Sequence, residues 1–142
     1  MSSRPWGWRS GGCTTREFAV ADAATGGITA GDFVIMESGN AGYIVPCSAG
    51  DKPIGVAMDT CSAPSADGAK KIRVCVDLDA IYEYPPDAGT VTQALVGTTM
   101  DTGGAQSINI DASTDDVITV VDVDTTRNTL FIKLTPTWLG VV

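Results

Sequence analysis

The chain has 142 residues, enough for one domain or two very small ones, and 44% of them are hydrophobic, as in folded rather than disordered sequences. The formal net charge of −8 argues against nucleic acid as a partner, because phosphate binding needs clustered lysine and arginine. The sequence contains no histidine, so the commonest general base of enzymes is absent. Only 18% of the residues are charged, which suits a surface that packs against other proteins.

Residues 1–16 are expected to form an extended N-terminal arm. This segment has no apolar periodicity, is rich in glycine, and bears arginine but no acidic residue. Tryptophan and arginine are enriched at protein interfaces, so we expect Trp6, Trp8 and Arg9 to contact another chain. The alternative is that the arm folds back on its own barrel and the two indoles fill a gap there.

Residues 17–84 are predicted to form a first set of strands, separated by turns rich in Gly, Asn, Asp and Pro. The strands are expected at 17–21, 33–36, 43–46, 54–58, 72–78 and 81–84. The turn over 38–42 contains residues that tolerate positive φ and should join its two neighbouring strands in a hairpin.

Residues 72–78 give the clearest half-buried strand, because apolar and polar side chains alternate along them at period two. Lys70, Lys71 and Arg73 form a small basic cluster at its start. These three residues are candidates for contact with an acidic patch on a neighbouring subunit. The alternative is that they are the solvent-exposed face of the strand.

The prolines at 85–86 give the strongest break, and we expect a sheet or subdomain boundary there. Residues 85–142 are predicted to form a second set of strands, which either completes the same barrel or forms a second lobe. Its strands are expected at 91–96, 98–100, 107–110, 117–124 and 129–135. Asn128 suits the positive φ of a hairpin turn between the last two. Trp138 is expected to insert into a neighbouring subunit or into the barrel mouth. No segment shows a helical period over ten residues, so the fold class is all-β.

No pattern in the sequence indicates catalysis, and we expect no enzyme activity and no cofactor. A cysteine nucleophile would lack its usual imidazole partner. The cysteines lack zinc-binding spacing and are expected to be free thiols in a cytosolic setting: Cys13, Cys47, Cys61 and Cys75. Two aspartate pairs, Asp77 with Asp79 and Asp122 with Asp124, could bind a hard cation, although exposed strand faces often carry this pattern. We expect no metal site.

Neither a signal peptide nor a membrane-spanning apolar run is found in the sequence. The chain is therefore expected to be made in the cytoplasm and to have no membrane partner.

Three motifs follow one another in the first strand set. They are Gly31-Asp32-Phe33-Val34-Ile35-Met36, Gly42-Tyr43-Ile44-Val45-Pro46 and Ala49-Gly50-Asp51-Lys52-Pro53-Ile54-Gly55-Val56-Ala57. Together with the basic strand that follows, this order resembles the small capsid decoration (cement) proteins of tailed bacteriophages. The resemblance covers about residues 28 to 84, and the second strand set departs from it.

The resemblance implies a small β-barrel or β-tulip-like sandwich of short antiparallel strands that forms homo-oligomers, often trimers. It also implies a place on the capsid exterior of the virion, where the chain would bind the major capsid protein at capsomer junctions and stabilise the shell. One alternative is a tail, head-fibre base or receptor-binding module of the virion. Another is a small β-barrel enzyme or metal-dependent binder that uses the aspartate pairs.

Overall fold

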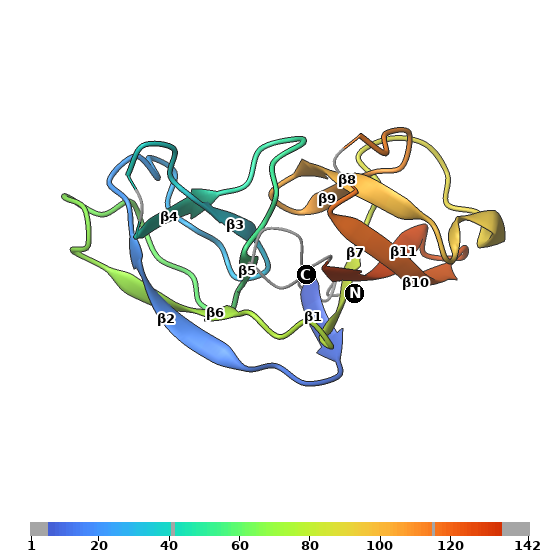
Figure 1. Cartoon of the computed structure of the whole chain (residues 1–142), viewed down its shortest axis with the longest axis horizontal. Coiled ribbons are helices and arrows are strands. Elements are labelled where there is room, and N and C mark those ends of the chain that lie inside the picture. The colour runs from blue at the N-terminus through green and yellow to red at the C-terminus, as the bar shows by residue number, and fades with distance from the viewer. Residues whose placement is uncertain (1–5, 41, 115, 135–142) are drawn as a thin grey trace.

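The computed structural model describes residues 6–40, 42–114 and 116–134, which fold into two β lobes (Figure 1). The elements are β1 (Gly7–Ser10), β2 (Thr15–Val20), β3 (Phe33–Met36), β4 (Tyr43–Pro46), β5 (Gly55–Ala57), β6 (Lys71–Cys75), β7 (Ile81–Tyr84), the 3₁₀ helix η1 (Gln93–Leu95), β8 (Thr99–Gly104), β9 (Ser107–Asn109), β10 (Ile118–Asp124) and β11 (Thr129–Leu134). The all-β prediction is confirmed. Among the described residues, none of the helical structure is long and apolar enough to cross a membrane.

The first lobe is a closed barrel with the strand order β2-β4-β3-β5-β6, in which β6 pairs back to β2. Its interior is aliphatic, because alternate strand residues such as Ile44, Ile72 and Val74 point inward and are buried. The predicted hairpin between β3 and β4 is confirmed. The strands pair in antiparallel fashion as expected, except β2 and β4, whose pairing is parallel.

The second lobe is a six-stranded sheet with the order β1-β7-β11-β10-β8-β9. The hairpin between β10 and β11 forms as predicted, and Asn128 adopts a φ of 58° in its turn. Residues 7–10 of the expected arm are not extended away from the molecule. They form β1, which pairs with β7 at one edge of the sheet and sets Ser10 opposite Ile81.

The two lobes do not divide the chain where the sequence predicted. The sheet takes β1 from the expected arm and β7 from the expected first strand set, so the barrel alone spans 15–75 and the sheet boundary lies between β6 and β7. The prolines at 85–86 mark the end of β7 instead. They run along the edge strand β9, where the Ile108 amide donates to the Pro85 carbonyl.

One predicted strand, 91–96, is replaced by η1. Val91 is buried, but the residues of η1 are not, and they pair with no strand in the described part of the chain. Without a neighbouring strand, the backbone of this segment has no hydrogen-bonding partner that would keep it extended.

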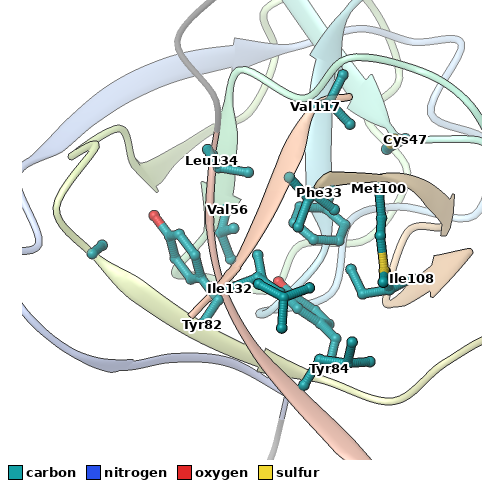
Figure 2. Close-up of a cluster of buried hydrophobic side chains, with 14 of the residues drawn as sticks. Phe33, Cys47, Val56, Tyr82, Tyr84, Met100, Ile108, Val117, Ile132 and Leu134 are labelled. Carbon is teal, nitrogen blue, oxygen red and sulfur yellow. The ribbon is translucent and has the colours of Figure 1, made fainter. Parts of the chain in front are cut away.

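A single large cluster of buried side chains joins the two lobes (Figure 2). Phe33, Val56 and Cys75 come from the barrel and pack against Tyr82, Tyr84 and the apolar face of the sheet. The rings of Phe33 and Tyr84 lie 4.3 Å apart between centroids. The Tyr84 hydroxyl also donates a hydrogen bond to the carbonyl of Gly31, in the loop before β3. The lobes therefore share one hydrophobic core in addition to the barrel's own interior.

Candidate interface surface

Trp8 lies on the edge strand β1, at the seam between the two lobes. It is 39% exposed, and Val96 is the other large hydrophobic residue exposed to a similar degree in the described parts of the chain. A groove of about 220 Å³ runs beside it, lined by Trp6, Trp8, Arg9, Ala30, Gly31, Ala57 and Met58. No described strand pairs with the outer edge of β1. The seam therefore presents an indole and an apolar groove beside a backbone edge that no described strand covers.

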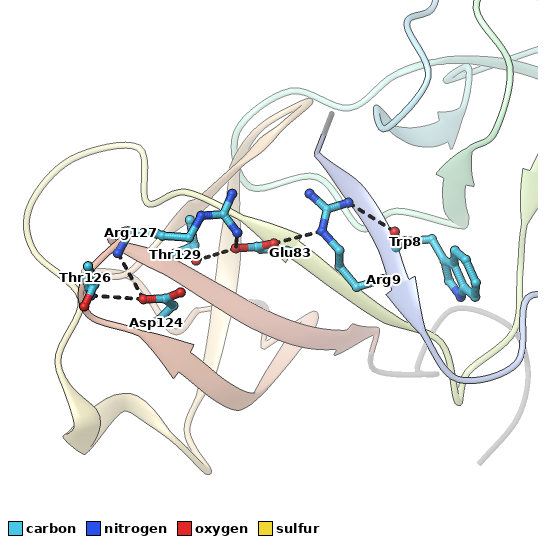
Figure 3. Close-up of polar contacts among 7 residues, drawn as sticks. All are labelled: Trp8, Arg9, Glu83, Asp124, Thr126, Arg127 and Thr129. Carbon is cyan, nitrogen blue, oxygen red and sulfur yellow. Dashed lines mark hydrogen bonds and ion pairs between the residues drawn. The ribbon is translucent and has the colours of Figure 1, made fainter. Parts of the chain in front are cut away.

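The side chain of Arg9 extends from β1 on the side opposite the Trp8 indole and is held there in a buried ion pair (Figure 3). Its Nε lies 2.8 Å from Oε1 of Glu83, whose side chain is completely buried, and Arg9 itself is only 14% exposed. The second carboxylate oxygen of Glu83 accepts from Arg127 at 2.8 Å and from the Thr129 hydroxyl at 2.6 Å. Most of the Arg9 side chain is thus inside the molecule, where the sequence predicted an interface residue.

Burial opposes the ionisation of Glu83, but the surrounding donors and charges outweigh it. The hydrogen bonds from Thr129 and Arg9, together with the positive charges of Arg127 and Arg9, hold the pKa of Glu83 below its ordinary value. The carboxylate therefore stays ionised at neutral pH and fixes β1, β7 and β11 to one another.

Trp6 is partly buried and packs against the shared core. The guanidinium carbon of Arg127 lies 5.9 Å from the centroid of its ring, within the range of a cation–π contact. The alternative in which the arm folds back and an indole fills a gap therefore describes Trp6, whereas Trp8 remains exposed.

The basic cluster lies on the outer side of the barrel at β6. Lys71 and Arg73 are exposed, and Arg73 makes a two-pronged contact with Asp59, with Nη2–Oδ1 2.7 Å and Nε–Oδ2 3.1 Å. These hydrogen bonds lower the pKa of the Asp59 carboxyl. Lys70 is half-buried and its amine donates to the backbone carbonyl and the hydroxyl of Ser62. No described residue forms an ion pair or hydrogen bond with the amine of Lys71.

Residues 58 and 59 connect the Trp8 groove to the basic strand. Met58 lines the groove, its backbone amide donates to the carbonyl of Arg73, and the next residue, Asp59, binds the Arg73 side chain. The Trp8 groove and the Arg73 side chain are thus connected through two consecutive residues. Trp138 lies outside the described residues.

The aspartate pairs serve local turns. The Asp77 carboxylate accepts from the Thr14 hydroxyl and from the Asp79 amide. Asp124 accepts from the amides of residues 126 and 127 in the last hairpin turn. Within residues 6–40, 42–114 and 116–134, no group of three or more His, Cys, Asp or Glu side chains is arranged to hold a metal ion.

Sequence reasoning missed Glu83 and the groove. The one available signal was a glutamate inside the otherwise apolar strand 81–84. Its arginine partners lie 74 and 44 residues away in the sequence, so no local pattern links them.

Comparison of the chain with protein-family models, curated proteins and solved structures gave no match.

Proposed function

We propose that this chain is a structural virion protein that binds the outer surface of a phage capsid and stabilises the shell as a cement protein. The observation that carries the proposal is Trp8, an exposed indole on the edge strand β1 of the described sheet, beside an apolar groove. Tryptophans in such positions are the residues that most often dominate the free energy of protein–protein association. The motifs of residues 28–84, which resemble cement proteins, supply most of the barrel that forms the other wall of this groove.

The proposed partner is the major capsid protein, and the expected state of the chain is a homo-oligomer, with a trimer favoured. A ligand that binds only the assembled lattice stabilises that lattice by mass action. Several linked copies around one junction add avidity without any new type of contact. Under this proposal the chain needs no catalytic group, cofactor or metal, and it acts on the virion exterior after synthesis in the host cytoplasm.

The first test is the copy number of the chain in purified particles, relative to the most abundant shell protein. A ratio near one to one is the expected result for a cement protein. A handful of copies per particle would instead favour a tail, fibre-base or receptor-binding part. Absence from particles would overturn the proposal.

The second test compares Trp8→Ala with Val96→Ala in binding to particles that lack the chain. Both side chains are exposed to a similar extent, but Val96 adjoins η1, away from the groove. We expect Trp8→Ala to weaken binding at least tenfold, the effect of losing an interface anchor worth about 1.4 kcal/mol or more. Val96→Ala should leave binding unchanged. Equal binding by both variants would exclude the Trp8 surface as the contact.

A further inference from the structure

Cys13 and Cys75 lie together at the seam between the lobes. Cys13 belongs to the connector from β1 to β2, which crosses from the sheet to the barrel. Thr15 lies opposite Cys75 in the pairing of β2 with β6, and the Val76 amide donates to the Thr14 carbonyl. This register brings Cys13 diagonally across from Cys75 on the same face. The Cys13 thiol lies 3.9 Å from the Met58 sulfur, and Cys75 is among the groups that raise the pKa of Cys13.

The two cysteines differ in access. Cys75 is completely buried in the shared core, whereas Cys13 is half-buried beneath the surface of the connector. Two glycines, Gly11 and Gly12, precede Cys13, and Gly11 has a φ of 79°. Glycine gives the connector the backbone freedom for the small shift that a covalent sulfur–sulfur bond requires.

We propose that Cys13 and Cys75 are an oxidisable pair that forms an intramolecular disulfide once the chain leaves a reducing compartment. The disulfide would tie the connector to β6 at the seam between the sheet and the barrel. This inference rests on the geometry of the chain alone and stands or falls independently of the proposed capsid role.

Glutathione disulfide is an oxidant of the class that can carry out the reaction. The thiolate of Cys13, the more exposed cysteine, attacks one sulfur of the oxidant and releases one glutathione thiolate. The Cys75 thiolate then attacks the Cys13 sulfur of the mixed disulfide and releases the second glutathione. The two protein thiols lose two protons and two electrons in all, and glutathione disulfide takes them up and becomes two molecules of reduced glutathione.

The reaction is expected to be slow at neutral pH. Burial, the neighbouring Cys75 thiol and the charge of Asp77 raise the pKa of Cys13 to about 12, against a smaller opposing effect of Arg73. Two further titratable groups lie near Cys75: Tyr82, whose hydroxyl is 3.5 Å from the Cys75 carbonyl, and Tyr84. Because the thiolate is the attacking species, the initial rate should rise close to tenfold per pH unit between pH 7 and 9.

The other cysteines are placed elsewhere. Cys47 is buried at the end of β4 and hydrogen-bonds to Thr102, while Cys61 sits in an isolated bridge with Ile28. Trypsin, which cuts after lysine and arginine but not before proline, separates these sites cleanly. Cys13 falls in peptide 10–16, Cys75 in peptide 74–127, and both Cys47 and Cys61 in peptide 17–70.

The folded full-length chain is incubated with glutathione disulfide, and the remaining thiols are blocked with iodoacetamide in denaturant. The chain is then digested with trypsin without reduction, and the peptide masses are measured by mass spectrometry. We expect peptide 10–16 to be joined to peptide 74–127. The oxidised chain should melt roughly 5–10 °C higher than the reduced one, because the cross-link closes a long loop in the unfolded state.

Two variants provide the controls. Cys13→Ser should abolish both the cross-linked peptide and the rise in melting temperature, while Cys61→Ser should preserve both. A stable glutathione adduct on Cys13, a cross-link through peptide 17–70, or a 13–75 cross-link that forms only in urea would overturn the proposal.

Discussion

At the scale of single residues, Glu83 is the charge on which the sheet edge depends. A completely buried carboxylate is expensive unless it is paired, and here Arg9, Arg127 and Thr129 all donate to it. By contrast, the pair of Arg73 with Asp59 is largely exposed, with 62% and 34% of the two side chains accessible. Water competes for that pair, so it adds little to stability.

Glu83→Gln is therefore expected to lower the free energy of unfolding by about 3 kcal/mol, because it leaves two arginines facing a neutral side chain in a buried site. Urea unfolding followed by tryptophan fluorescence measures the loss. The matched control is Arg73→Gln, which removes the exposed pair and should leave the unfolding midpoint unchanged. Similar midpoints for the two variants would contradict this account of Glu83.

The stabilisation by Glu83 should also depend on pH. Its pKa in the folded chain lies below the ordinary value of 4.5, so its contribution is fully present above pH 4.5 and is lost as the pH falls toward the folded-state pKa. The difference in unfolding free energy between the unsubstituted chain and Glu83→Gln should shrink below pH 4.5. The lowered pKa values of Asp59 and Asp116 affect both chains and cancel in this difference. A difference that is constant from pH 7 to 3 would contradict the assignment.

At the scale of elements, β7 links the lobes. It pairs with β1 on one side and with β11 on the other, and its two tyrosines reach the barrel. Tyr84 donates a short hydrogen bond to the Gly31 carbonyl and stacks near Phe33. Tyr82 makes a longer contact, 3.5 Å from its hydroxyl to the Cys75 carbonyl.

Tyr84→Phe should lower the unfolding free energy by about 1–2 kcal/mol, because the buried Gly31 carbonyl loses its donor while the ring packing is kept. Tyr82→Phe, on the same strand and equally buried, is the matched control and should cost less than half as much. Chemical denaturation of both variants makes the comparison. A larger loss in Tyr82→Phe would contradict this prediction, because the longer contact to the Cys75 carbonyl would then stabilise the fold more than the bond to Gly31.

Some strands could be predicted from the sequence and others could not. β3 and β4 were predicted with their observed bounds, because alternation, glycine turns and proline act over a few residues. The position of β1 could not be predicted, since its partner β7 lies more than 70 residues away and three glycines in residues 7–12 obscure its pattern. For the same reason, Trp6 and Trp8 looked equivalent in the sequence although only Trp8 is exposed.

At the scale of the whole molecule, the shared core couples the lobes. Barrel residues such as Phe33 and Val56 are buried by the sheet, so the unfolding of one lobe would expose apolar surface on the other. Small chains with one continuous core usually unfold in a single step.

Unfolding is therefore expected to be one cooperative transition. In a Trp138→Phe variant, tryptophan fluorescence reports on β1 and its surroundings through Trp6 and Trp8, whereas far-ultraviolet circular dichroism reports on all strands. The two urea curves should superimpose, with the same midpoint and slope. Two separated transitions would show that the barrel and the sheet are independently stable.

The pairing of Ser10 with Ile81 has a consequence for how such a chain could have arisen. If residues 11–80 are set aside, β1 and β7 are the two arms of a hairpin, and the entire barrel occupies the place of its turn. A segment whose two ends lie side by side can be inserted into a host or removed from it without displacing the host's strands. The barrel is thus an insertion in the sheet lobe, between β1 and β7. The seam that carries Trp8 and Cys13 is the boundary between this inserted barrel and the sheet that flanks it in the sequence.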